Sequence, residues 1–177
     1  MTTRVGLLRG INVGKAKRIA MADLRALVEA AGFAEARTLL NSGNIVFKGP
    51  RAQAPRVAAQ LEKAIEDRVG FHSHVVVLDA ATIGTVVAEQ TLSQADNPSR
   101  LLVGFVQDIS RLESLAGLAA RPWEPEALAV GSRAVYMWVP EGIVDSALVD
   151  AVSRALGTYV TTRNFATVQK LHAMTRE

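Results

Sequence analysis

The stretch ARTLLNSGNIVFK, residues 36–48, decides how this chain folds. Residues 36–40 and 45–48 have the short apolar pattern of strands, and the tetrad Asn41-Ser42-Gly43-Asn44 between them is rich in turn formers. Two strands joined by so short a segment are expected to pair. The stretch therefore predicts a strand pair in the first half of the chain.

The segments on either side of this pair complete a six-element unit. Apolar residues recur at three- and four-residue steps over 21–31 and again from Pro55 to Val69, which predicts two helices. Val5–Leu8 and Val75–Leu78 have the pattern of buried strands. The order strand, helix, strand, strand, helix, strand is that of the ferredoxin-like split βαβ unit.

The second half of the chain repeats this order. Ser110 with Glu113 has the spacing of a capping box, and Gly131-Ser132 is expected to be a two-residue hairpin turn. The remaining elements are strands at 101–106, 127–130, 134–139 and 159–161 and helices at 148–156 and 164–174. We therefore expect an α+β fold of two ferredoxin-like (βαββαβ-type) subdomains in tandem with a C-terminal helix. The expected parts are residues 1–79, a connecting helix and linker over 80–100, and residues 101–177.

Composition is that of a globular protein without membrane segments. The chain has 177 residues, of which 49% are hydrophobic and 21% charged, and it has no cysteine. No apolar run approaches the roughly 20 residues of a membrane span, and the first apolar stretch is too short for a signal peptide. We expect a cytoplasmic protein without membrane contact. Disulfides, thiol catalysis and cysteine-bound metal are excluded.

Positive charge gathers in the first half of the chain. Residues 1–90 carry 12 Lys and Arg against 8 Asp and Glu, whereas residues 91–177 carry 8 against 9. Arg9, Lys15, Lys17 and Arg18 form a basic segment, and no acidic residue precedes Asp23. Such a segment attracts phosphates or acidic partners. The alternative is a solvated loop whose charge only maintains solubility.

The motif Leu7-Leu8-Arg9-Gly10-Ile11-Asn12-Val13-Gly14 is the first candidate site. Its glycines let a ligand approach the backbone, Arg9 suits a phosphate or carboxylate, and Asn12 can donate and accept. With Gly14 and Lys15 it could bind an anion. The glycine spacing matches neither a P-loop nor a dinucleotide fingerprint. The alternative is a wide loop in which the glycines only satisfy backbone angles.

Two further polar motifs lie beside predicted strands. Ser42 and Asn44 could contact a ligand, or they could bond their own backbone within the turn. In Thr161-Thr162-Arg163-Asn164, either Thr162 or Asn164 is expected to cap the last helix. Arg163 could then bind an anion at that helix end or form an ion pair between the subdomains. Arg163 and Asn164 are therefore included among the candidate ligand-binding residues.

Catalytic and metal-binding patterns are sparse. His72 and His74 would lie on one face of an extended segment, but no third ligand is obvious nearby, so we expect exposed histidines and no metal. No catalytic triad or carboxylate pair stands out, and no cofactor is expected. Tyr136 and Trp138 share a strand face and could stack on RNA bases, although a core or interface role is the favoured interpretation.

The chain resembles the DUF1697 family of uncharacterised bacterial proteins over nearly its whole length. The resemblance rests on four motifs: residues 7–14, Met21 with Leu24, Ser42-Gly43-Asn44-Ile45-Val46-Phe47, and Thr161-Thr162-Arg163-Asn164 followed by Thr167-Val168 and Lys170-Leu171. It implies a two-subdomain α+β fold and no established reaction, substrate or cofactor. The chain departs from the family pattern at Lys15, where a second glycine is common, at Asn41, where Gln is typical, and at Phe165, where Trp is typical.

The function expected from these motifs is a cytoplasmic binding module for a small anionic or phosphate-bearing ligand at the cleft between the subdomains. An enzyme of unrecognised type is an alternative, although no reaction centre supports it. A nucleic-acid binder that uses loop 9–18 is a second alternative, and a structural or dimerising protein is a third. The sequence leaves the oligomeric state open.

Overall fold

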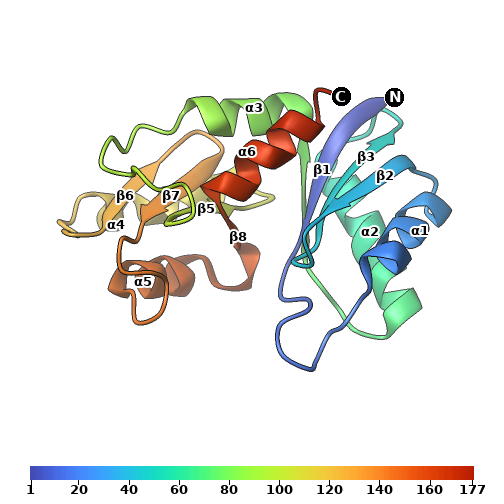
Figure 1. Cartoon of the computed structure of the whole chain (residues 1–177), viewed down its shortest axis with the longest axis horizontal. Coiled ribbons are helices and arrows are strands. Elements are labelled where there is room, and N and C mark those ends of the chain that lie inside the picture. The colour runs from blue at the N-terminus through green and yellow to red at the C-terminus, as the bar shows by residue number, and fades with distance from the viewer. The chain divides into compact units, whose positions relative to one another are not determined.

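The computed structural model describes residues 1–177, which divide into two compact units. The first unit contains residues 1–83 and 171–177, and the second contains residues 84–170. Each unit has one four-stranded antiparallel sheet with helices (Figure 1). None of the helices combines the length and the apolar character that a membrane span requires.

The first unit follows the expected order of elements. The strand β1 lies at the centre of the sheet, whose order is β2-β3-β1-β4, with every neighbouring pair antiparallel. This is the ferredoxin-like arrangement predicted from the sequence. The elements are β1 (Thr2–Leu8), α1 (Met21–Ala30), β2 (Ala34–Leu39), β3 (Asn44–Gly49), α2 (Ala54–Val69) and β4 (Val75–Asp79).

Both helices of the first unit pack against one face of its sheet. The periodic apolar residues of the sequence form this core, in which Leu24 and Leu61 are almost completely buried. Phe33 and Phe47 meet edge to face with ring centroids 5.0 Å apart. The cluster combines helix residues (Leu24, Leu27, Val28, Val57, Ala58, Leu61, Ile65) with strand residues (Leu8, Ile45, Phe47, Val75, Val77).

The second unit repeats this topology. Its sheet has the order β6-β7-β5-β8, again with every neighbouring pair antiparallel. The elements are α3 (Ala80–Ala88), β5 (Leu101–Phe105), η1 (Ile109–Leu115), α4 (Ala116–Ala119), β6 (Ala127–Val130), β7 (Ala134–Trp138), α5 (Ala147–Leu156), η2 (Gly157–Tyr159), β8 (Thr161–Asn164) and α6 (Phe165–Met174). Of these, α3 and α6 each contain residues of both units.

The two aromatic residues considered for base stacking are buried. Tyr136 and Trp138 are 0% and 7% exposed, and the Tyr136 hydroxyl donates to Val86 O at 2.6 Å. Burial raises the pKa of the Tyr136 phenol, and the charge of Glu89 adds to that shift. The favoured interpretation of these two residues as core side chains is confirmed, and they form no exposed platform for bases.

Three local predictions for the second half were wrong. Asp108, not Ser110, begins the helical segment after β5: its carboxylate accepts from Ser110 N at 3.1 Å, and the turn continues as a 3₁₀ helix. The two-residue turn between β6 and β7 lies one residue later than expected: Val130 pairs with Val135 and Gly131 N donates to Ala134 O, so the turn residues are Ser132 and Arg133. The last strand begins at Thr161 rather than Tyr159, since 157–159 form a short 3₁₀ turn.

Candidate functional site

The basic loop between β1 and α1 has a defined backbone shape. Gly10, Asn12, Gly14 and Lys17 all have left-handed φ angles, at 66°, 55°, 64° and 51°. Glycine adopts this conformation without strain, and asparagine tolerates it better than most residues. Gly10 and Gly14 of the first sequence motif therefore adopt backbone angles that the loop requires. A ligand-binding role for the loop stays a prediction.

Asn12 holds this loop together. Its side-chain Nδ2 donates to Ile19 O at 2.9 Å and to Asn41 O at 2.8 Å, and its Oδ1 accepts from Ile19 N at 2.9 Å. Its backbone N donates to Lys17 O at 3.0 Å. Asn12 thus ties both ends of the loop to each other and to the β2–β3 turn.

A cavity of about 410 Å³ opens where this loop enters α1. The N-cap residue of that helix, Ala20, provides no side-chain hydrogen bond, so the helix begins without a polar cap. A helix N-terminus carries unsatisfied N–H groups and a partial positive charge. The lining residues are Asn12, Arg18, Ile19, Ala20, Met21 and Asn41.

The charged side chains of the loop are all basic. Arg18 lines the cavity, and its Nη1 donates to Asn12 O at 3.3 Å and to Gly14 O at 3.1 Å. Lys17 Nζ donates to His72 O at 3.3 Å, and the Arg9 backbone N donates to His74 O at 2.9 Å. Lys15 is exposed. The cavity therefore lies in a positive region of the first unit.

The second polar motif forms the β2–β3 turn. Asn44 is fully buried, and its Nδ2 donates to Leu39 O at 2.8 Å and to Ser42 Oγ at 2.9 Å. Local hydrogen bonding was one of the two roles expected for these side chains. The place of Ser42 and Asn44 in a ligand site stays a prediction.

The third motif lies on β8 and at the start of α6. Asn164 Oδ1 accepts from Thr167 N at 2.9 Å, which confirms the expected cap of the last helix. Arg163 Nη1 donates to Thr162 O at 2.8 Å, and burial lowers the pKa of Arg163 to about 10, so its guanidinium stays protonated at neutral pH. That Arg163 and Asn164 share a site with Arg9 and Asn12 stays a prediction.

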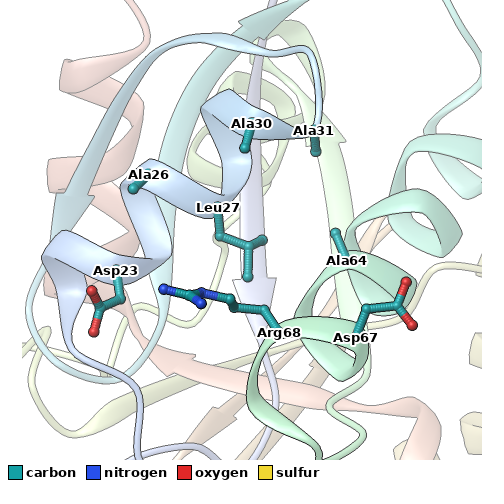
Figure 2. A pocket seen from close by; sticks show the side chains of 8 residues that line it. All are labelled: Asp23, Ala26, Leu27, Ala30, Ala31, Ala64, Asp67 and Arg68. Carbon is teal, nitrogen blue, oxygen red and sulfur yellow. The ribbon is translucent and has the colours of Figure 1, made fainter.

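A second cavity of about 510 Å³ lies between α1 and α2. Alanines on both helices leave this space, and Arg68 extends from α2 toward α1 beneath Leu27 (Figure 2). The charged residues of this cavity are Asp23, Asp67 and Arg68, whereas the charged residue that lines the first cavity is Arg18. The lining residues are Asp23, Ala26, Leu27, Ala30, Ala31, Ala64, Asp67 and Arg68.

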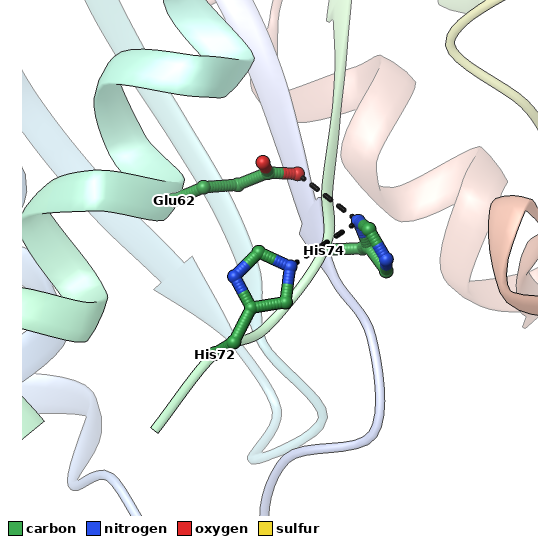
Figure 3. Close-up of side chains that lie close together, drawn as sticks. All are labelled: Glu62, His72 and His74. Carbon is green, nitrogen blue, oxygen red and sulfur yellow. Dashed lines mark hydrogen bonds and ion pairs between the residues drawn. The ribbon is translucent and has the colours of Figure 1, made fainter. Parts of the chain in front are cut away.

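A cluster of two histidines and a glutamate lies between α2, which carries Glu62, and the segment before β4, which carries His72 and His74. His72 Nε2 lies 3.5 Å from His74 Nδ1, which in turn lies 3.5 Å from Glu62 Oε1 (Figure 3). One ligand atom from each residue lies within 4.8 Å of the other two. The sequence gives no direct sign of this third ligand, because Glu62 lies ten residues before His72. Between them α2 ends and the chain turns back at Gly70.

The comparisons with known proteins agree with the motifs and the topology. Residues 1–136 match the model of the family described as "Protein of unknown function (DUF1697)". The chain belongs to the DUF1697 family. No curated protein matches its sequence. Among solved structures, the conserved bacterial protein SP0830 from Streptococcus pneumoniae is similar, with a TM-score of 0.81, 22% identity and 98% of each chain covered.

This structural match concerns the fold of the DUF1697 protein. At 22% identity over 98% of both chains, it shows that the two proteins share the tandem α+β architecture. Neither the family description nor the match to that structure names a ligand or a reaction.

Proposed function

We propose that this DUF1697 protein is a binding module for a small anionic ligand, such as a phosphate ester or a carboxylate. The observation that carries the proposal is the cavity at the start of α1, lined by Arg18 and by Asn12 and Asn41. It combines a guanidinium, amide groups and an uncapped helix N-terminus in one space. Each of these favours negative charge.

Charge separates this cavity from the one between α1 and α2. Asp23, Asp67 and Arg68 line the helix groove, so its charged groups are mostly acidic. Among the residues that line the loop cavity, Arg18 is the one that carries a charge. The chain has no acidic residue before Asp23. An anion would therefore be attracted more strongly to the loop cavity than to the cavity between α1 and α2.

The organisation of the loop also supports binding. Asn12 fixes the loop by three side-chain hydrogen bonds, and Arg18 contacts two loop carbonyls. A loop that is already ordered loses little conformational entropy when a ligand binds.

Thermal unfolding against a panel of ligands tests the proposal. The panel consists of inorganic phosphate, nucleotides, sugar phosphates, dicarboxylates and a short RNA. A ligand at about 100 times its Kd stabilises the folded state by about 2.7 kcal/mol, which raises Tm by roughly 5–10 °C in a chain of this size. RNA as the sole stabilising compound would support the nucleic-acid alternative instead.

Asn41→Asp is the decisive variant. The Asn41 backbone carbonyl holds Asn12, so this side-chain change leaves that hydrogen bond available while placing a carboxylate at the cavity. We expect the ligand-induced Tm shift to disappear with little change in the Tm of the free protein. Arg56→Gln removes an exposed cation on α2 and serves as the charge control. If no anion raises Tm, or if Asn41→Asp and Arg56→Gln respond equally, the loop cavity is not the site.

A further inference from the structure

The geometry points to a second binding site in the first unit: we propose that Glu62, His72 and His74 bind a divalent transition-metal ion of the zinc type. This site is separate from the anion cavity, since it shares no lining residue with it. It rests on the spacing of three ligand atoms, on the groups that hold them in place and on local charge.

The spacing of the atoms fits tetrahedral coordination. With metal–nitrogen and metal–oxygen bonds near 2.1 Å, two ligands of a tetrahedral ion lie about 3.4 Å apart. His74 Nδ1 lies 3.5 Å from both His72 Nε2 and Glu62 Oε1. The ligand atoms of the third pair, His72 and Glu62, lie within 4.8 Å of each other.

The backbone holds the ligands in position before any ion binds. Val75 N donates to Glu62 Oε1 at 2.9 Å, which fixes this carboxylate of α2 beside the start of β4. The segment that carries the histidines is held in turn, because Ser73 Oγ donates to Arg9 O at 2.9 Å. Ligands held in place lose little entropy on binding a metal.

Glu66 supplies the outer contact that metal-bound histidines usually have. It lies one helical turn after Glu62, and its Oε2 lies 3.7 Å from His72 Nδ1. A carboxylate at this nitrogen favours the tautomer in which Nδ1 carries the proton and Nε2 is free to bind a metal. Glu66 is therefore a positioning residue for His72.

Local charge and access favour a cation. Glu62 and Glu66 contribute two negative charges, whereas Lys17, whose Nζ contacts His72 O, contributes one positive charge. The side chains of His72 and His74 are 47% and 41% exposed, so an ion can reach them from solvent. Three protein ligands leave a fourth position open for water or an added ligand, and imidazole with carboxylate suits zinc and its neighbours.

Calorimetric titration of the full chain with Zn²⁺ tests the site. The protein must carry no polyhistidine tag, because a tag would bind the ion itself. We expect one Zn²⁺ per chain at neutral pH. His72→Ala and His74→Ala should each weaken binding about tenfold or more. His172→Ala removes the remaining histidine, on α6, and should change nothing.

Co²⁺ used in place of Zn²⁺ reports the coordination itself. Intense visible absorption of the four-coordinate type is expected, and Glu62→Gln should change the spectrum. Glu66→Gln should lower affinity about tenfold while leaving the spectrum unchanged, since it acts through His72. Circular dichroism would verify that each variant is folded. Absence of binding, or equal Zn²⁺ affinity in the wild type and a His72→Ala/His74→Ala double variant, would overturn the proposal.

Discussion

Arg4 Nε lies 3.5 Å from Asp79 Oδ1, between residues directly opposite each other on β1 and β4. The two partners differ in solvation, because the Arg4 side chain is 2% exposed and the Asp79 side chain 47%. Arg4 also donates to Ala52 O, whereas its Nε and Nη1 have no hydrogen-bond partner. The buried cation thus depends on a carboxylate that water can reach.

Substitutions of Asp79 and of Arg4 should therefore lower the free energy of unfolding by different amounts. Asp79→Asn leaves a buried charge without its counter-ion and should cost about 2 kcal/mol or more, while Arg4→Met replaces that charge with apolar volume and should cost about 1 kcal/mol. Urea denaturation of both variants measures this difference. A larger loss in Arg4→Met would show that the guanidinium is a net stabiliser.

Gly43 is constrained twice, by its own backbone and by its neighbours. Its φ is +83°, and an added Cβ would lie 2.7 Å from Leu8 Cβ and 2.8 Å from Ile11 Cδ1. Gly14 has a similar φ of +64° but open space around it. We expect Gly14→Ala to cost about 1 kcal/mol from the left-handed backbone alone and Gly43→Ala about 3 kcal/mol. Equal losses in chemical denaturation would mean that Leu8 and Ile11 can move aside.

The elements that the sequence predicted well are those whose signal is local. Apolar periodicity identified α1, α2 and α5, and Asn164 was recognised as a cap because a cap and its helix are adjacent in the chain. The error after β5 has the same origin, since Asp108 and Ser110 both have side chains suited to capping and only geometry separates them.

The candidate sites depend on contacts between residues far apart in the chain, and the apolar periodicity of the sequence does not predict such contacts. Asn12 was predicted as a ligand contact, yet its amide also reaches Asn41, 29 residues away. Glu62 reaches the histidines only because α2 ends at Gly70, whose φ of +78° turns the chain back. A glutamate pair on one helix face just before a glycine stop and a His-X-His segment is the signal that could have indicated this cluster.

Tyr136 should make the protein sensitive to alkali. Burial raises the pKa of its phenol in the folded state, so the folded chain keeps this proton where the unfolded chain loses it. Stability from this group is complete below the unfolded pKa of about 10 and falls as pH rises above it. Tyr136→Phe should lose about 1 kcal/mol at neutral pH, through the bond to Val86 O, and show a flatter decline above about pH 10. Parallel declines in the two proteins would mean that another group titrates.

Asn12 offers a test of how the basic loop is held. Asn12→Asp keeps the size of the side chain but replaces the donor to Ile19 O and Asn41 O with a second carboxylate oxygen. Two carbonyls then face an anion, and we expect a loss of about 2–3 kcal/mol. Asn12→Gly removes all three side-chain bonds while relaxing the φ of +55°, and should cost about 1–2 kcal/mol.

The comparison of these two Asn12 variants separates repulsion from simple loss of bonds. Hydrogen exchange of the Lys17 to Ala20 amides provides a local measure, because these residues follow the Asn12 contacts directly. Exchange should be fastest in Asn12→Asp, intermediate in Asn12→Gly and slowest in the wild type. If both variants keep wild-type exchange and stability, the loop is held by Arg18 and its two carbonyl contacts instead.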